Sequence, residues 1–459
     1  MMVNRRVGKQ SCVALIWVLT MSLAGMNALA AIDANDINEL NAAAEPEASA
    51  GEIVDKQINN WFRKHNVTPG LSSKSGKIYY SAKAVIAFPP ENAQWAKSRQ
   101  MAFKKALNRA RADFIFDKVG RVRTSTDSST SRNADSDALG ADANMCKMGQ
   151  YESFWEKVKA LAGAKLDQAL REAGVDPERY KSSPEDMQKE LFYEASVTTT
   201  LKTASAEISG LIPVQTFEGI SKDGRSVIGV IMMYSPKLYV LSDDLRNGRE
   251  PKMLGKKVGR SVKSYTDRSK EQLKNMMGLR IVFDEDSRPV LLRYGQWGYS
   301  FKGNNTRSME RHRINAFKKA DTRALEDLSE FINGKLRMKS ETKVGEVVRE
   351  YLAISCEDGN LVQRDGSEEQ MIDRLSGQLE IRSSAKAAGT TEVKRWSYKN
   401  EFGQEVIGVV RAWTLDGLNS AMQVKEQRKD LSVTAKPSRV NSNITVMSSE
   451  ELSDPEEDF

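Results

Sequence analysis

A segment of fifteen residues occurs twice in this chain, and no other feature restricts the fold as strongly. Residues 99–113 and 313–327 are identical at nine positions and share the run Ala-Phe-Lys-Lys-Ala. Further along, residues 224–230 and 403–409 share the run Val-Ile-Gly-Val. The offset between the copies falls from 214 to 179 residues between these two matches. The sequence therefore predicts one structural unit present twice, with a longer insertion in the first copy.

Each copy has the pattern of a strand, a long helix (about 92–119 in the first copy), an insertion and a set of about three antiparallel strands. The set ends in a predicted hairpin, at 212–234 in the first copy and at 392–413 in the second. The first copy spans 76–240, with its insertion at 121–192, and the second spans 280–416. Alternating apolar and polar residues indicate the strands, whereas apolar residues three to four positions apart indicate the helix. A helix packed on an antiparallel sheet belongs to the α+β class. We therefore expect two tandem α+β units, each large enough for its own core.

Small residues recur on one face of both long helices, at positions i, i+4 and i+8 of each copy. They are Ala102, Ala106, Ala110, Ala316, Ala320 and Ala324. Residues four apart share a helix face, so these alanines form a narrow stripe of small side chains. We expect each stripe to bring its helix close to a sheet.

Local patterns predict several further elements. Residues 31–75 are predicted to be a leader followed by an amphipathic helix over 52–64. A threonine-rich alternation over 193–206 predicts a strand, and Gly295 predicts a β-bulge. The polar composition of 417–459, which ends in an acidic run, predicts a flexible tail.

The first thirty residues have the three parts of a secretory signal peptide. Arg5, Arg6 and Lys9 form a basic start, residues 12–26 are mostly apolar, and residues 28–30 read Ala-Leu-Ala. This order is typical of a cleaved export signal; an uncleaved N-terminal anchor is the alternative. We expect a periplasmic or secreted protein with no transmembrane span in the mature chain.

Cysteine positions bear on lipidation and on disulfides. Cys12 precedes the apolar run instead of following it, so no lipobox is predicted. Cys146 and Cys356 remain after cleavage, and an oxidising compartment permits one disulfide between them. Two free thiols, or pairing between chains, are the alternatives that the sequence leaves open.

Motifs of catalysis are missing from the sequence. It contains neither a Gly-x-Ser-x-Gly elbow nor a His-Glu-x-x-His helix, and residues 248–257 lack the spacing of a phosphate loop. The only histidines, His65 and His312, occupy unrelated positions, which disfavours a zinc site. We therefore expect no cofactor, no metal and no enzymatic activity; an enzyme with its site in the insertion 121–192 is a third hypothesis.

A basic connector over 241–279 separates the two copies. Between Arg246 and Lys274 it has ten Lys or Arg against three Asp or Glu. A solvated linker is one interpretation. Contact with anionic envelope polymers, lipid head groups or an acidic protein is the other. The candidate binding residues are Lys256, Lys257, Arg260 and Lys263.

Aromatic residues cluster in one predicted strand of the second copy. Tyr294, Trp297, Tyr299 and Phe301 lie within eight residues of one another. Core packing is one interpretation of this cluster, and an exposed stacking surface for a sugar or a protein is the other.

Predicted loss of the signal removes three cations and leaves 66 basic against 62 acidic residues, a balance that requires no nucleic-acid partner.

The alanine-striped helix (Ala102, Ala106, Ala110, Arg109 and Asp113), followed by the Val-Ile-Gly-Val strand at 227–230, resembles one bacterial envelope domain. This domain occurs in small outer-membrane lipoproteins and in the flagellar T-ring assembly protein. The resemblance implies a non-catalytic periplasmic part of an envelope structure. The leading hypothesis is thus a scaffold or adaptor of a secretion, conjugation or motility apparatus, with protein partners in the cell envelope. The alternative is a secreted binding protein for envelope glycan or lipid.

Overall fold

The computed structural model describes part of the chain. Described are residues 49–120, 147–252, 255, 258–299, 304–333, 335–339, 341–354, 356–357, 360–361, 367–382 and 389–434. The predicted signal peptide, Cys146, Lys256, Lys257, Phe301 and the acidic run at the C-terminus lie outside these residues.

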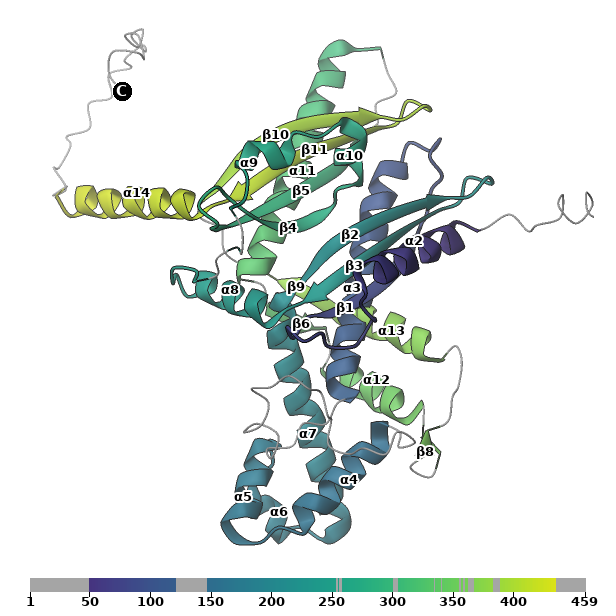
Figure 1. Ribbon diagram of the computed structural model, residues 1–459, viewed down its shortest axis with the longest axis vertical. Coiled ribbons are helices and arrows are strands. Elements are labelled where there is room, and N and C mark those ends of the chain that lie inside the picture. Colours follow the sequence, from purple (N-terminus) through teal and green to yellow (C-terminus); the bar gives the residue numbers. More distant parts are fainter. Residues whose placement is uncertain are drawn as a thin grey trace, which may run out of the picture. The chain divides into compact units, whose positions relative to one another are not determined.

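The first unit is a three-stranded antiparallel sheet with a long helix on one face (Figure 1). Its elements are β1 (Ile78–Ile86), α3 (Trp95–Gly120), β2 (Leu211–Ile220) and β3 (Ser226–Tyr234). The strand order is β1-β3-β2, and α3 packs on β1 and β3. The hairpin of β2 and β3 is where the sequence predicted it, with Gly224 at φ 78° in the turn.

The second unit is a four-stranded antiparallel sheet with a long helix on one face. Its elements are β4 (Gly278–Phe283), β5 (Pro289–Tyr299), α11 (Thr306–Asn333), β10 (Thr390–Lys399) and β11 (Glu405–Trp413), in the order β10-β11-β5-β4. The two sheets share a pairing pattern. In the first, β1 precedes the long helix and pairs with the last strand β3, which also pairs with β2. In the second, β5 precedes the long helix and pairs with the last strand β11, which also pairs with β10. β4 is the strand without a counterpart. The fold is α+β, as predicted.

Both alanine stripes are buried, and a glycine marks where the second one meets its sheet. A Cβ atom on Gly295 would lie 2.2 Å from the carbonyl oxygen of Ala320 and 2.9 Å from the Cβ of Ala324. The pairing of β5 with β11 continues through Gly295 without a register shift. The predicted bulge is therefore wrong. The glycine has another role, because α11 lies too close to β5 at this point to leave room for a Cβ atom.

The shared Val-Ile-Gly-Val run has the same orientation in both sheets, and its glycine faces away from the long helix. In the first unit this face is covered by α2 (Ala50–His65), and a Cβ on Gly229 would lie 2.3 Å from Val54. In the second unit a Cβ on the equivalent Gly408 would lie 1.9 Å from the ring of Trp396. The predicted amphipathic helix is therefore present, and its apolar face covers the first sheet.

The insertion of the first unit is entirely helical where it is described. It comprises α4 (Lys147–Lys159), α5 (Gly163–Glu172), α6 (Pro177–Ser182), α7 (Glu185–Glu207) and the 3₁₀ turn η2 (Ile208–Gly210). Trp155, Leu170, Tyr180 and Phe192 contribute to a small core of its own.

The strand predicted over 193–206 is wrong, because these residues belong to α7. Val197, Leu201 and Ala204 are buried at helical spacing. Tertiary burial of this helical face outweighs the β preference of the threonines between them.

The connector and the second insertion also contain regular structure. The connector includes α8 (Pro236–Arg246), α9 (Val262–Thr266) and α10 (Lys270–Asn275). The second insertion comprises β6 (Lys335–Met338), α12 (Glu341–Ile354), β7 (Cys356–Glu357), β8 (Asn360–Leu361), α13 (Ser367–Gln378) and β9 (Leu379–Arg382). α14 (Leu415–Thr434) replaces the start of the predicted flexible tail, and Leu418 packs against a buried apolar cluster.

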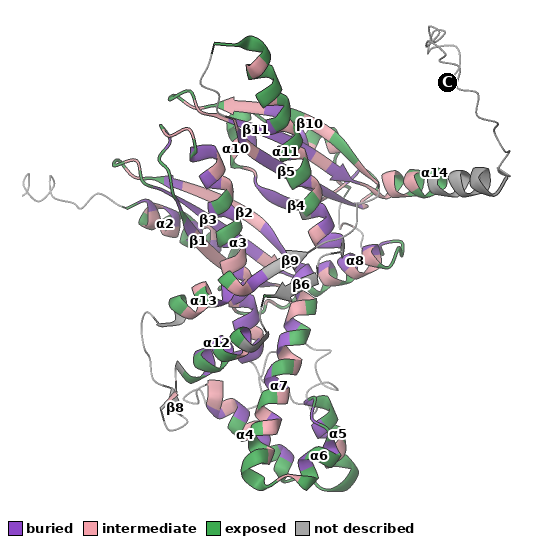
Figure 2. Cartoon of the chain, turned by 180° about the vertical axis from the view of Figure 1, so that it is seen from behind, coloured by how far each residue is buried: buried purple, intermediate pink, exposed green. Residues whose placement is uncertain are grey.

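Burial is concentrated in the strands and in α3 (Figure 2). Within the described segments, no helix combines the length and the apolar character needed to cross a membrane.

Candidate functional site

The two units are joined by a buried polar network around Arg99 of α3, which contacts β5 as well as its own sheet. Arg99 is 1% exposed. Its Nε donates to Glu218 Oε2 at 2.8 Å, its Nη1 to Gln296 Oε1 at 2.9 Å, and its Nη2 to the carbonyl oxygen of Lys274 at 2.9 Å. All three donating nitrogens of one guanidinium thus link α3 to β2, β5 and α10.

The partners of Arg99 are themselves well paired. Gln296 Nε2 donates to the carbonyl oxygens of Lys274 and Met276 at 2.9 and 2.7 Å. The Lys274 ammonium lies 3.6 Å from Glu218. Burial alone would raise the pKa of Glu218, but the charges of Arg99 and Lys274 and their hydrogen bonds lower it below its usual value. Glu218 is therefore held as a carboxylate between two cations.

A second link joins the edges of the two sheets. Arg280 of β4 donates from Nη1 to the carbonyl oxygen of Pro213 at 2.9 Å, and from Nη2 to Thr216 Oγ1 at 3.1 Å. Burial lowers the pKa of Arg280 to about 10, which leaves it charged at neutral pH. Because Arg280 binds the edge of β2, it occupies acceptors that an exposed edge would offer to another chain.

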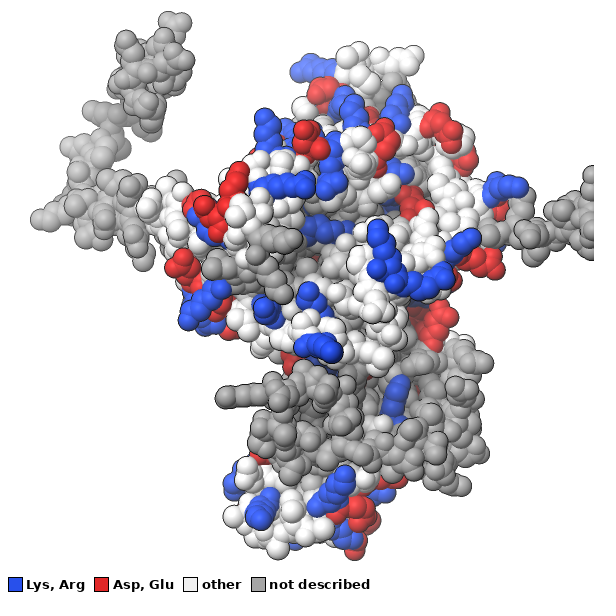
Figure 3. All heavy atoms as spheres, viewed as in Figure 1, with Lys and Arg blue, Asp and Glu red and all other residues white. Residues whose placement is uncertain are grey.

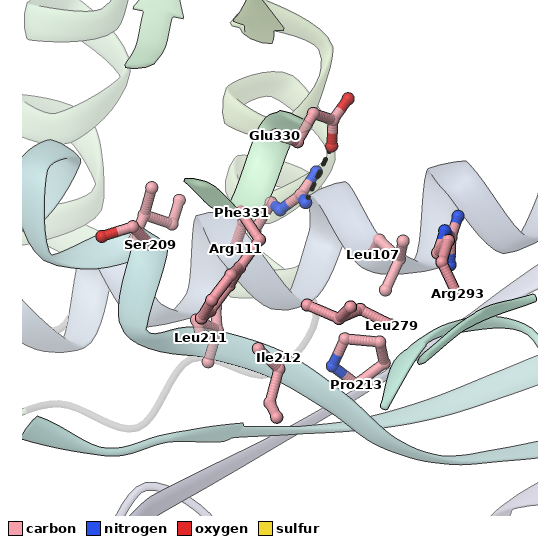
Figure 4. Close-up of a pocket in the computed structure, with 11 residues that line it drawn as sticks. Leu107, Arg111, Ser209, Leu211, Ile212, Pro213, Leu279, Arg293, Glu330 and Phe331 are labelled. Atoms are coloured by element: carbon pink, nitrogen blue, oxygen red, sulfur yellow. Dashed lines mark hydrogen bonds and ion pairs between the residues drawn. The ribbon is translucent and has the colours of Figure 1, made fainter. Parts of the chain in front are cut away.

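A small cavity of about 50 Å³ lies at the start of β2, next to Pro213, and Figure 4 shows the residues that line it. Arg111 reaches Glu330 at 3.5 Å on one side of it. Burial lowers the pKa of Arg293 to about 9. The remaining lining is mostly apolar: Leu107, Ile208, Ser209, Leu211, Ile212, Pro213, Leu279 and Phe331. A cavity of this size holds one or two water molecules, not an organic substrate.

The basic connector is a fixed part of the second unit. Gly259 N donates to the carbonyl oxygen of Asp284 at 2.9 Å, and Arg260 N to that of Phe283 at 3.1 Å. The side chains of Arg260 and Lys263 are exposed. At residues 259 and 260 the connector is therefore held against the sheet, and contact of its exposed cations with an anionic partner stays a prediction.

Part of the connector's positive charge is neutralised within the chain. Arg249 forms ion pairs with Asp243 and with Asp244, the latter at 2.8 Å, and Lys274 faces Glu218. Figure 3 shows basic and acidic side chains interspersed over the face that carries α9 and α10. The exposed cations therefore form a local patch and not a strongly basic surface.

The aromatic cluster is divided between two faces of β5. Tyr294 is 2% exposed, and its hydroxyl donates to the carbonyl oxygen of Tyr265 in α9 at 3.5 Å. Trp297 and Tyr299 are half-buried on the α11 side. The ammonium of Lys319 lies 5.3 Å from the Trp297 ring centroid. Tyr294, Trp297 and Tyr299 therefore do not form one exposed surface. The connector covers Tyr294, and core packing is the correct interpretation for this residue.

Cys356 takes part in a disulfide bond, and Cys146 lies outside the described residues. Within the described segments, no group of three or more His, Cys, Asp or Glu side chains is placed to hold a metal ion.

Sequence reasoning missed the network of Arg99, Glu218 and Gln296. One signal was available, because Arg99 is identical to Arg313 in the repeated segment. The partners carried no such signal, since they lie more than a hundred residues from Arg99.

Comparisons with known proteins give little functional information. Residues 151–247 match the model of a domain of unknown function, DUF6844, which begins within α4 and ends just after α8. The insertion 121–192 thus falls within this match from residue 151 onward. A crystal structure of hypothetical protein FTT1539c from Francisella tularensis is similar, with 22% identity and a TM-score of 0.46 over 83% of this chain and 99% of that chain. No curated protein matches.

Proposed function

We propose that this chain is a non-catalytic scaffold or adaptor of a bacterial cell-envelope assembly, such as a secretion, conjugation or motility apparatus. It acts after export to the periplasm, as its signal-like first thirty residues predict. The observation that carries the proposal is the buried network of Arg99, Glu218 and Gln296. This network joins two similar helix-on-sheet units into one body, which suits a part that holds partners at a constant separation.

The partner surface in this proposal includes the connector. Arg260 and Lys263 are exposed. The backbone of Arg260 is bonded to Phe283 of the second sheet, and α9, which contains Lys263, is tied to the same carbonyl oxygen through the Tyr265 hydroxyl, so the two charges are presented in a constant arrangement. Ordered charges lose less conformational entropy on binding than charges on a flexible linker. An acidic protein surface is the partner that this patch complements.

The test is cross-linking in cells that produce either the native chain or a charge-reversed variant. The variant changes Lys256, Lys257, Arg260 and Lys263 to Glu. A matched control reverses four exposed and scattered lysines, Lys64, Lys104, Lys202 and Lys318. We expect the first variant to lose its envelope cross-links and the control to keep them, while both remain folded. The difference should be largest at low ionic strength, because salt screens exposed charges.

Retention of all cross-links by the connector variant would remove the connector from the proposal. Absence of envelope proteins among the cross-linked partners of the native chain would overturn the scaffold itself. The alternative of a glycan- or lipid-binding surface formed by the aromatics of 294–301 and the connector loses one of its supports, since Tyr294 is buried.

A further inference from the structure

The helical insertion contains a larger cavity than the junction between the units. About 250 Å³ lies between α4 and α7. The lining residues are Met148, Tyr151, Glu152, Trp155, Asp186, Lys189, Glu190, Phe192 and Tyr193. All except Met148 lie in the segment that matches the domain family. The cavity is somewhat smaller than the 300 to 1,000 Å³ usual for drug-sized ligands, so it suits a small molecule or a single side chain.

Aromatic rings make up the inner wall of this cavity, and packing holds them in place. Tyr151, Trp155 and Phe192 are 2%, 6% and 1% exposed. The Tyr151 hydroxyl donates to the carbonyl oxygen of Val119 at 2.8 Å, and its ring meets that of Tyr193 edge-on at 5.4 Å. Burial raises the pKa of Tyr193 to about 12, so its phenol stays protonated at neutral pH. The wall is thus neutral, rigid and rich in π faces.

The Trp155 ring already attracts ammonium groups of the chain itself. Lys159 Nζ lies 4.9 Å and Lys189 Nζ lies 5.8 Å from its ring centroid. An ammonium within about 6 Å of an indole centroid is attracted by the ring quadrupole. This wall therefore has the electrostatic character of a cation-binding surface.

The charged side chains at the rim of the cavity also favour a cation. Lys189 is the one cation lining the cavity, and its ammonium lies 3.0 Å from Glu152. Among the described residues, no ion pair joins Asp186 or Glu190 to a cation. Two carboxylates therefore remain at the rim, and their potential repels anions and attracts cations.

Two residues of the lining also carry a buried hydrogen-bond donor. Trp155 Nε1 and the Tyr193 hydroxyl have no hydrogen-bond partner among the described residues. A buried donor without an acceptor is costly, so a ligand oxygen that reached either donor as the wall adjusts would relieve this cost.

We propose that the cavity between α4 and α7 binds a small alkylammonium compound bearing a hydroxyl, of the choline type. The aromatic wall contacts the methyl groups and the positive charge, and Asp186 and Glu190 at the rim add Coulomb attraction. The same ammonium chemistry occurs in free choline and in the head group of phosphatidylcholine.

Isothermal titration of the native full-length protein tests this with three probes. They are choline, its neutral isostere 3,3-dimethylbutan-1-ol, and tetramethylammonium, which lacks the hydroxyl. We expect choline to bind at least about tenfold more tightly than the neutral isostere, because only choline gains the cation–π and rim interactions. Tetramethylammonium should fall between them. Flotation with phosphatidylcholine vesicles distinguishes a lipid head group from the free cation: co-flotation assigns the former, and its absence assigns the latter.

Two charge variants assign the binding to this cavity. The pair Asp186→Asn with Glu190→Gln should weaken choline binding at least about fivefold, as expected for loss of two rim charges. The matched pair Glu172→Gln with Glu178→Gln removes two exposed carboxylates of the same insertion that do not line the cavity, and it should change the affinity by less than about twofold. Trp155→Leu should abolish binding, with circular dichroism to check its fold.

Two results would overturn the proposal. One is the absence of saturable choline binding up to about 10 mM, where even millimolar affinity is measurable. The other is equal affinity for choline and its neutral isostere, or equal weakening by both pairs of charge variants.

Discussion

Arg99 Nε lies 2.8 Å from Glu218 Oε2, and the residues at the equivalent positions of the second unit also meet, with Arg313 Nη2 at 3.4 Å from Ser397 Oγ. The same helix-to-strand contact thus occurs in both copies. In the first copy it is buried and charged, because β5 and α10 cover it. In the second, the side chain of Arg313 is 42% exposed. The position of Glu218 is thus occupied by a serine in the second unit, where Arg313 also lies 3.5 Å from Glu405, and only the contact of the first unit is buried at the junction.

Replacing Glu218 by Gln should destabilise the protein by roughly 3–5 kcal/mol, the usual result of removing one partner from a buried ion pair. The variant leaves Arg99 and Lys274 facing each other without an anion. Asp55→Asn is the control, since its pair with Lys83 has side chains that are 45% and 38% exposed and should contribute less than about 1 kcal/mol. Urea unfolding measures both. Equal small losses would mean that the network does not join the units.

The same substitution should change the acid sensitivity of the fold. The folded-state pKa of Glu218 is lowered from its usual 4.5, mainly because the charges of Arg99 and Lys274 overcome the opposing effect of burial. Its stabilising contribution is therefore present above pH 4.5 and is lost as the pH falls through the lowered value. The difference in unfolding free energy between wild type and Glu218→Gln should be constant at neutral pH and shrink in acid. A difference that stays constant down to about pH 2 would contradict the pKa shift.

Gly295→Ala should be strongly destabilising, by about 2 kcal/mol or more, because the new methyl group would lie 2.2 Å from the Ala320 carbonyl oxygen. Gly345→Ala in α12 is the matched control. A Cβ at Gly345 meets nothing within 4 Å, so this change should be neutral or stabilise the helix by up to about 1 kcal/mol. Thermal unfolding of the two variants checks the contrast. If Gly295→Ala unfolds like wild type, α11 does not lie this close to β5.

The disulfide of Cys356 is expected to involve Cys146. Helix α4 begins at Lys147, directly after Cys146, and packs beside β7, which begins at Cys356. The ammonium of Lys147 lies 3.7 Å from the ring centroid of Tyr351. Mass spectrometry of the unreduced, digested protein should find the two cysteines in one linked peptide. A covalent dimer on a non-reducing gel, or two alkylated thiols, would contradict this assignment.

Reduction of this bond should destabilise the fold by roughly 2–4 kcal/mol, because the bond closes a long loop of the unfolded chain. Cys356→Ser should show the same loss and should be insensitive to reductant. A variant that remains as stable as the oxidised wild type would mean that the bond has no structural role.

The sequence predicted the parts of the fold that depend on local pattern and on the repeat. Both long helices, both terminal hairpins and the N-terminal helix lie within a few residues of their expected positions. Periodicity is a local property, so it can be read from the sequence before any tertiary contact is known. The predicted strand at 193–206 failed because threonines prefer strands only when no helical face is buried, and Val197 and Leu201 bury one.

The junction between the units could not be read from the sequence. Arg99, Glu218, Lys274 and Gln296 are ordinary polar residues in their local segments, and only the packing of α3 against both sheets brings them together. For the aromatic residues of β5, the sequence predicted the strand but not which side chains are buried. The alternation of side chains across a sheet divides Tyr294 from Trp297.

The glycine of the Val-Ile-Gly-Val run has a consequence for how each sheet is covered. Gly229 and Gly408 leave the same indentation in two sheets, yet a separate helix occupies the first and a side chain of the adjacent strand occupies the second. The sheet therefore does not dictate what covers it. A sheet with this indentation can be covered by a separate helix or by a side chain of its own neighbouring strand, with the same pairing of its last two strands.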